Sequence, residues 1–182
     1  MIRDFVKQKL GDQSGFTLIE MLVVVIILGI LAMIIVPQIT VSTEDARKTT
    51  LQQNLGIMRN SIETYAAQHR NRYPGVYSEA DGTTLTASDA LAKAALMAQL
   101  TQFTNLDGRV QATKYATYKY GPYIKTGTLP TNPYNDNFDV VVDFDQNDIT
   151  TARAPAGAGE GWQYFAPIGV SFANDSAAHA VL

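Results

Sequence analysis

Residues 15–37 read GFTLIEMLVVVIILGILAMIIVP, and this stretch decides how the chain is organised. Within residues 16–36 the only polar side chains are those of Thr17 and Glu20. An apolar segment of about 20 residues spans the hydrocarbon core of a bilayer as a helix. The sequence therefore predicts one transmembrane helix over residues 16–36.

The segment before this helix, residues 1–15, reads MIRDFVKQKLGDQSG and carries more basic than acidic side chains. An excess of Lys and Arg keeps a flanking segment in the cytoplasm, so we expect the C-terminal part to lie on the outer side. A secretory signal peptide fits poorly, because its apolar region has roughly 7–15 residues and ends at a small-x-small cleavage site. A plain signal anchor explains the hydrophobicity but gives no reason for Glu20.

Glu20 is the unusual feature of the apolar helix. A carboxylate within a membrane segment is costly and by default indicates a functional partner. That partner must be a cation or a hydrogen-bond donor, and no Lys, Arg or His occurs within residues 16–36. We therefore expect the partner to come from another molecule or from a newly formed amino terminus.

The motif GFTLIE at residues 15–20, ahead of a spanning segment and behind a short basic leader, closely resembles the prepilin leader of type IV pilins and type II secretion pseudopilins. The resemblance implies that residues 1–15 are a leader peptide. It implies cleavage between Gly15 and Phe16 by a prepilin peptidase, followed by N-methylation of Phe16. It also implies that Glu20 meets the amino group of a neighbouring subunit's Phe16, which supplies the missing cation.

Gly29 and Pro37 bracket the C-terminal part of the apolar helix. Proline removes a helical hydrogen bond and glycine weakens the helix, so the residues between them are expected to be the least helical part. Simple interpretations are close helix packing at Gly29 and a kink at Pro37. The resemblance favours local melting of this stretch when the subunit enters a filament, and both interpretations can hold together.

Beyond Pro37 the pattern becomes that of an amphipathic helix. Residues 42–45, STED, offer helix-start chemistry. Apolar or amphipathic residues then alternate at spacings of four and three: Leu51, Leu55, Met58, Ile62, Tyr65 and His69. This is one helical face, which predicts a stripe that packs against a head domain and a helix end near Asn71. We expect His69 to be a buried core histidine rather than a ligand.

The remainder of the chain predicts a short second helix and a sheet. Thr86 and Asp89 form a capping-box pattern before the alanine-rich run ALAKAALMAQLTQF, which predicts a helix near residues 87–103. Alternation over residues 138–145 predicts a half-buried strand, and residues 162–172 predict a hairpin. We therefore expect an α+β pilin-like fold, in which the long helix packs on a small antiparallel sheet. Its head is residues 37–182, with the amphipathic helical half at about 37–72.

Three short segments of the head are similar to the major pseudopilin of type II secretion: residues 121–124, 129–135 and 161–164. That family carries a Leu-Pro-x-Asp-Pro-aromatic stretch, and this chain has Asn132 where Asp is frequent. The similarity favours a pseudopilin over an adhesive type IV pilus pilin, and the absence of cysteine points the same way. A membrane-anchored periplasmic binding module is the remaining alternative.

The resemblance implies a structural filament subunit whose partners are other copies of itself, minor pseudopilins, an inner-membrane assembly platform and a secretion ATPase. It places the chain in the bacterial inner membrane, single-pass, with the amino terminus cytoplasmic and the head periplasmic, before it joins a periplasmic filament. No cofactor is required by this function.

An acidic run after the predicted strand raises the question of calcium. Asp143, Asp145, Asn147 and Asp148 supply oxygen ligands at nearly alternate positions, but the glycine and the closing glutamate of an EF-hand are missing. Major pseudopilins bind calcium in C-terminal loops, so an irregular site that also draws on Asp139 or Asp175 is one interpretation. A polar strand end and turn is the other.

The sequence excludes several other classes of function. A net charge of -3 gives no basic footprint for nucleic acid, and the absence of cysteine excludes disulfide frameworks and thiolate chemistry. Ser171, Asp175 and His179 could be written as a catalytic triad, but they lie in what we expect to be a mobile tail. No catalytic sequence motif accompanies them, so we do not expect an enzyme.

Overall fold

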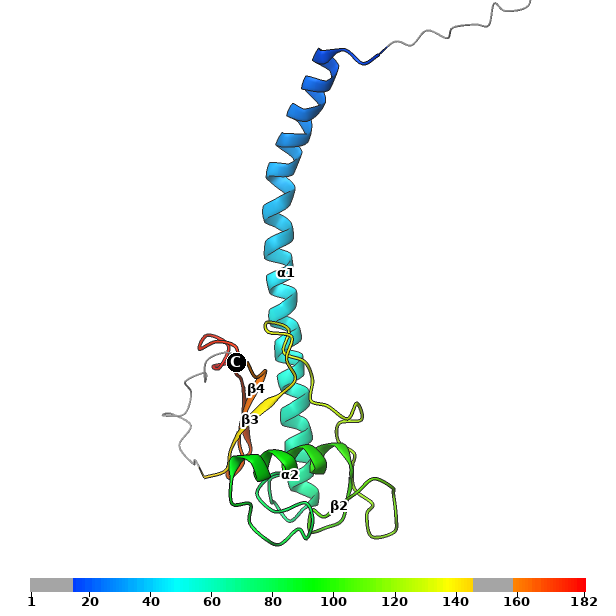
Figure 1. Ribbon diagram of the computed structural model, residues 1–182, viewed down its shortest axis with the longest axis vertical. Helices are drawn as coiled ribbons and strands as arrows, with labels where there is room; N and C mark the ends of the chain where they lie inside the picture. Colours follow the sequence, from blue (N-terminus) through cyan, green and yellow to red (C-terminus); the bar gives the residue numbers. More distant parts are fainter. Residues whose placement is uncertain (1–14, 146–158) are drawn as a thin grey trace, which may run out of the picture. The chain divides into compact units, whose positions relative to one another are not determined.

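The computed structural model describes residues 15–145 and 159–182, and within α1 the side chains of residues 36–42 are not described. The chain divides into two compact units, Met1–Glu44 and Asp45–Leu182. Helix α1 (Leu18–Gln68) contributes to both units, and the remaining elements belong to the second (Figure 1).

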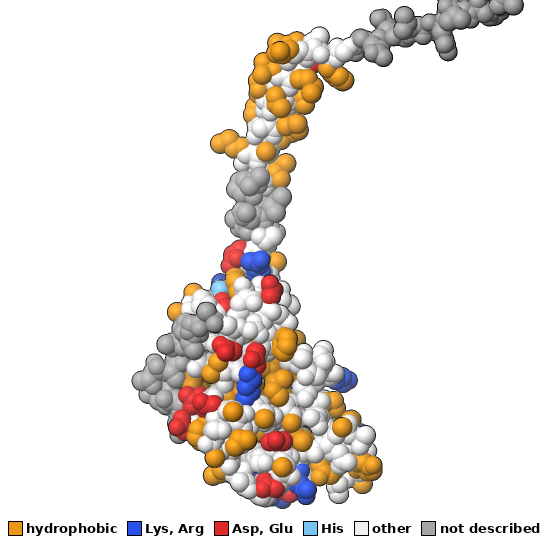
Figure 2. Space-filling model, in the orientation of Figure 1, with side chains coloured by type: hydrophobic (Ala, Val, Ile, Leu, Met, Phe, Trp, Pro, Cys, Tyr) orange, Lys and Arg blue, Asp and Glu red, His pale blue; other side chains and the backbone are white. Residues whose placement is uncertain are grey.

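The first unit consists of the apolar part of α1. Residues Leu18–Ile35 have a mean hydropathy of 3.1, and none of this window is buried within the chain. Among the described residues this is the one helix long and apolar enough to cross a membrane. Figure 2 shows the apolar side chains covering its visible surface.

In the second unit, which we call the head, α1 buries the predicted stripe. The six stripe residues are at most 3% exposed: Leu51, Leu55, Met58, Ile62, Tyr65 and His69. The stripe prediction and the prediction of a buried His69 are therefore confirmed. The α1 helix ends at Gln68, slightly before the predicted end at Asn71, because Arg70 and Asn71 adopt φ angles of 57° and 60°. Such left-handed residues terminate a helix.

The second helix, α2 (Asp89–Thr101), lies within the predicted range 87–103. Its N-cap is Ser88, whose hydroxyl accepts a hydrogen bond from Leu91 N, so the predicted cap at Thr86 is wrong. The Thr86 hydroxyl instead donates to Gly75 O at 2.9 Å and ties the preceding loop to the turn after α1. Both Thr86 and Ser88 can cap a helix, and because the Thr86 hydroxyl bonds to Gly75 O, Ser88 is the cap.

Two small sheets complete the head. One pairs β1 (Phe103–Thr104) with β2 (Val110–Gln111), and the other has the order β3 (Val140–Asp143), β4 (Trp162–Phe165), β5 (Val170–Ala173). The predicted hairpin is confirmed, because β4 and β5 are antiparallel. The pair β3 and β4 is parallel, so the expectation of a wholly antiparallel sheet is wrong. Parallel neighbours need a connection of a dozen or more residues, and the long segment between β3 and β4 provides it.

The core of the head contains side chains from both the helices and the three-stranded sheet. Its buried side chains come from α1, from α2 and from the inner face of the three-stranded sheet, with Trp162 and Tyr164 fully buried. Trp162 Nε1 donates to Pro130 O at 2.7 Å, and Tyr164 OH donates to Pro74 O at 2.9 Å. A buried aromatic side chain with a polar end needs such a partner, so these bonds hold in place the loops that contain Pro130 and Pro74. The α+β pilin-like fold class is confirmed.

Candidate assembly site

The start of α1 is closed by a reciprocal capping box. Thr17 precedes the first helical residue, and its backbone N and its hydroxyl both donate to Glu20 Oε2 at 2.7 Å. In return, Glu20 N donates to the Thr17 hydroxyl at 3.3 Å. A Thr at the cap and a Glu three residues later satisfy two unpaired helix-start donors in this way. The carboxylate also lies where the helix dipole favours negative charge.

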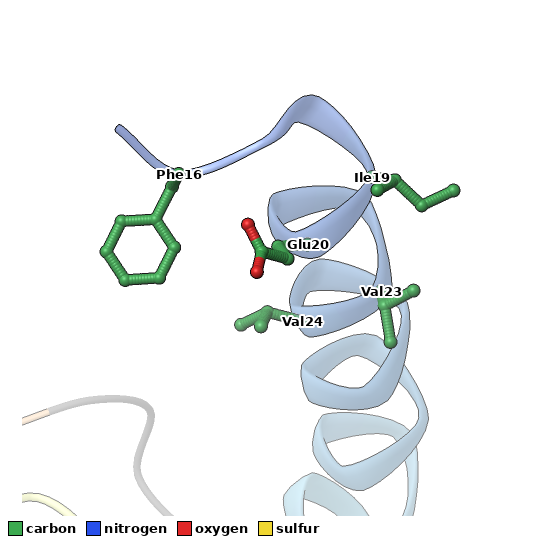
Figure 3. Close-up of a pocket in the computed structure, with 5 residues that line it drawn as sticks. All are labelled: Phe16, Ile19, Glu20, Val23 and Val24. Atoms are coloured by element: carbon green, nitrogen blue, oxygen red, sulfur yellow. The ribbon is translucent and has the colours of Figure 1, made fainter. Parts of the chain in front are cut away.

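Glu20 presents its carboxylate on one side of the helix. Figure 3 shows it on the side where the Phe16 ring lies, with Val24 below it, while Ile19 and Val23 point to the other side. These five residues line a shallow apolar recess. Phe16 itself is 83% exposed and precedes the helix, so the described part of the chain leaves most of its surface uncovered. The site thus presents an exposed aromatic residue beside a carboxylate at the helix start.

The capping box corrects one part of the sequence reasoning. The sequence indicates that the partner of Glu20 comes from another molecule or a new amino terminus, because residues 16–36 contain no Lys, Arg or His. Thr17 supplies two donors from the same chain. The missed signal was the Thr-x-x-Glu spacing of residues 17–20, which is a known helix-start pattern. Both bonds end on one oxygen, and a carboxylate has about four acceptor sites, so capacity for a further donor remains.

Gly15 lies in the non-helical segment just before the capping box, and a Cβ there would meet nothing within 4 Å. The same holds for Gly29, so its surface has no packing partner within the described chain. The backbone is helical from Gly29 through Pro37, although the side chain of Pro37 is not described. Melting of this stretch on assembly stays a prediction.

The predicted calcium residues are only partly described. Asn147 and Asp148 lie outside the described residues, whereas Asp143 ends β3 and accepts a hydrogen bond from Asp145 N at 3.3 Å. The two further candidates have other partners. Asp139 pairs with Lys93 Nζ at 2.6 Å, and Asp175 accepts from Asn132 Nδ2 at 2.8 Å. Across residues 15–145 and 159–182, no group of three or more metal-binding side chains gathers, and calcium stays a prediction.

The three residues written as a triad do not form one. Asp175 and His179 contact each other, but the Ser171 hydroxyl is buried in β5 without a hydrogen-bond partner. The expectation of a mobile tail is also wrong in structural terms. The tail packs on the head, with Ala180 only 4% exposed and Leu182 O accepting from Arg59 Nη1 at 3.1 Å.

The tyrosines between α2 and the sheet divide into two groups. Tyr123 packs edge-on against Tyr65, and its hydroxyl donates to Gln68 Oε1 at 2.7 Å, which anchors the end of α1. Burial raises the pKa of Tyr123 to about 12. Tyr115, by contrast, is 59% exposed on a surface turn shared with Tyr118. The first group belongs to the core, and the second is available to a partner.

Comparison with known proteins agrees with this site. The family described as the prokaryotic N-terminal methylation motif matches residues 10–36, which include the capping box. The chain is also 30% identical to the type II secretion system core protein G of Aeromonas hydrophila, over 71% of this chain and 73% of that protein. The chain belongs to the core protein G family.

Other relatives support the same assignment for this pseudopilin. The core protein G of Vibrio cholerae is 29% identical over 85% of this chain and 88% of that protein. The ComG operon protein 3 homolog of Bacillus licheniformis is 32% identical over a shorter stretch, 35% of this chain and 65% of that protein. No solved structure matches the chain. The prediction of a pilin-like chain most similar to major pseudopilins is confirmed, and the alternatives are not favoured.

Proposed function

We propose that this pseudopilin is the structural subunit of a type II secretion pseudopilus, a filament whose growth drives exoprotein export. The similarity to core protein G over most of both chains carries the proposal. The exposed apolar helix with its capped, carboxylate-bearing start supports a subunit that associates through that helix. The family is structural, and the work in this mechanism is mechanical.

Maturation comes first. A prepilin peptidase cleaves between Gly15 and Phe16 and methylates the new amino terminus of Phe16. Because Thr17 lies beyond the cleavage point, both halves of the capping box are retained in the mature chain. The new amine then lies at the end of a helix that is already closed. This leaves Phe16 free to meet a neighbouring subunit.

Assembly then pairs neighbouring helices. The amino group of one subunit's Phe16 approaches Glu20 of the next, using the acceptor capacity that the Thr17 bonds leave on the carboxylate. An amine and a carboxylate attract more strongly once lipid and protein have replaced water around them. Melting between Gly29 and Pro37 lets the apolar helices adjust as they bundle.

The location and the partners follow from this cycle. Before assembly the subunit lies in the bacterial inner membrane as a single-pass protein, with the amino terminus cytoplasmic and the head periplasmic. An assembly platform and a secretion ATPase extract it into the filament, where it contacts copies of itself and minor pseudopilins. Growth and retraction of the filament push exoprotein through an outer-membrane channel.

The test uses cells that contain a complete secretion machinery and lack their own core protein G. The wild-type chain should restore export, yield filaments that can be sheared from overexpressing cells, and show a mature amino terminus at methylated Phe16 by intact-mass spectrometry. Gly15→Leu should leave the full-length precursor in the membrane, whereas Gly11→Leu is a matched substitution within the leader and should be processed. A wild-type chain that stays unprocessed and makes no filaments would disprove the proposal.

A further inference from the structure

A surface turn rich in lysine and tyrosine lies between β2 and Tyr120. Tyr115 and Tyr118 exchange backbone hydrogen bonds with N–O distances of 3.4 and 3.0 Å, so residues 116–117 form its tip. Lys114 precedes Tyr115 and Lys119 follows Tyr118, one on each arm, and both lysines are exposed. We call residues 114–119 the lysine turn.

The lysine turn belongs to a basic stretch in an acidic protein. Every charged residue from 108 to 135 is basic, although the chain carries a net charge of -3. Within the described ranges, neither Lys114 nor Lys119 forms an ion pair, and the charged end of Lys119 lies 5.2 Å from the ring centre of Tyr120. Among the described residues, the turn therefore presents two cations without an ion-pair partner, one of them beside the partly exposed Tyr120 ring.

The acidic counterpart lies where α2 begins and β3 ends. Asp89 is the first residue of α2, and its carboxylate accepts a hydrogen bond from Phe144 N at 3.2 Å. Asp143 and Asp145 flank Phe144, and we call the three aspartates the acidic end. Asp145 N donates to an Asp143 carboxylate oxygen at 3.3 Å, so Asp145 lies beside that side chain just past the end of β3.

These two surfaces lie at opposite ends of α2. The acidic end lies at the first turn of α2. Near the last turn of α2, Tyr123 N and Ile124 N both donate to Leu100 O at 2.9 Å. A helix of 13 residues is about 20 Å long, so the charges of opposite sign are well separated within one head. Figure 1 shows the two ends of α2.

We propose that the lysine turn of one subunit docks against the acidic end of another copy of this chain. The inference rests on the proposed filament function and names a contact between heads within it. The partner is a second copy because its surface has the complementary charge. A contact between two different patches is heterologous, and repeated heterologous contacts generate open helical filaments rather than closed dimers.

The geometry suits both attraction and specificity. The exposed Tyr115 ring adds apolar area to the same turn, which a purely ionic surface lacks. Complementary charges mainly set partner choice and register, while like charges brought together oppose assembly strongly. Exposed pairs are screened over about 8 Å at physiological ionic strength, so the contact weakens as salt is raised.

Charge reversal in the full-length chain tests the contact. Lys114→Glu with Lys119→Glu, and separately Asp143→Lys with Asp145→Lys, should each lower the yield of sheared filaments about tenfold or more relative to wild type. The combined variant restores the opposite charges with the signs exchanged, and its yield should recover to near the wild-type level. Membrane levels and leader cleavage are measured in each strain. Lys114→Gln with Lys119→Gln, which adds no new charge, should give an intermediate loss.

Each other outcome is decisive. Wild-type yield from both reversed variants would overturn the contact, as would failure of the combined variant when all three are processed and stable. If the lysine reversal leaves filaments intact but lowers export, the turn faces exported protein instead. If only the aspartate reversal and a chelator prevent filaments, a calcium ion occupies the acidic end. Absence of filaments from the wild-type chain would instead refute the proposed function.

Discussion

Asn132 joins three parts of the head through one buried amide. Its Nδ2 donates to Gly161 O at 2.9 Å and to Asp175 Oδ1 at 2.8 Å, and its Oδ1 accepts from Tyr134 N at 2.9 Å. The side chain is 0% exposed. The substitution Asn132→Asp asks whether a carboxylate can replace this amide. The contacts indicate that it cannot.

The expected loss of stability follows from the two hydrogen bonds that Asn132 Nδ2 donates, because an ionised carboxylate cannot donate them. The bond to a neutral carbonyl is worth about 1 kcal/mol and the bond to a charged acceptor about 1.5–3 kcal/mol. The introduced carboxylate would also lie against that of Asp175 in a buried site. Leaving a buried charge without compensation costs about 3–5 kcal/mol. We therefore expect Asn132→Asp to lower the free energy of unfolding by about 3–5 kcal/mol at neutral pH, a large share of typical domain stability.

The pH dependence distinguishes this explanation from simple loss of packing. Burial beside a second carboxylate raises the pKa of the introduced group, so it becomes protonated as pH falls and can then donate to Asp175. The penalty should be largest above neutral pH and should shrink as pH falls through the raised pKa. Denaturant unfolding of the unit Asp45–Leu182 at several pH values measures it, with Asn132→Ala as the control whose penalty has no such trend. Equal penalties for Asn132→Asp at pH 5 and pH 8 would refute the reasoning.

Three further predictions concern the head. Gln99→Leu should destabilise it by about 3 kcal/mol in denaturant unfolding, because the amide of Gln99, which is 1% exposed, bonds to Gly75 N, Tyr77 O and Gly108 O. An effect below about 1 kcal/mol would contradict this. Burial lowers the pKa of His69, so the neutral ring is favoured in the folded state. Stability should therefore decline as pH falls below 6.5, the ordinary pKa of histidine. His69→Gln should flatten that decline, and an unchanged slope of stability against pH would count against this explanation. Millimolar calcium should raise the melting temperature if Asp143 and Asp145 help to bind it, and identical melting in chelator would favour a polar turn.

The sequence predicted best what local periodicity dictates. The stripe from Leu51 to His69 follows from the helical period alone, and each predicted member is buried. The β4–β5 hairpin was predictable because its turn is local. The parallel partner of β4 was not, because β3 is separated from it by a long connection that carries no pairing signal. Likewise, the choice of Ser88 over Thr86 as the cap depended on a bond to Gly75, which is distant in sequence.

The candidate site shows the same division. The motif at residues 15–20 located the site correctly, since the helix begins at Leu18 and the carboxylate lies at its start. The partner within the chain is a hydroxyl and a backbone N–H, which carry no charge, so the absence of Lys, Arg and His from residues 16–36 does not reveal it. As a consequence, Glu20 now has two separable roles. One closes the helix within a subunit, and the other is the proposed pairing with a neighbour's amine.

Two substitutions separate these roles. Glu20→Gln keeps an acceptor at the third helical position, where capping boxes use Glu or Gln, but removes the negative charge. Thr17→Val keeps the charge and removes both the hydroxyl donor and the cap. If the charge pairs with the amine of a neighbouring Phe16, Glu20→Gln should insert and be cleaved normally but yield several-fold fewer sheared filaments. Thr17→Val should retain most of the wild-type yield.

The controls address insertion and the cap itself. Thr17→Ser preserves the capping hydroxyl and should match wild type, and Glu20→Val removes both roles and should be the most defective variant in assembly while inserting at least as well. Membrane level and intact mass are compared for all four variants, so that loss of filaments is not confused with loss of subunit. The decisive comparison is between Glu20→Gln and Thr17→Val. Full filament yield from the first and failure of the second would show that Glu20 closes the helix, and that the attraction between subunits comes from elsewhere on the apolar surface.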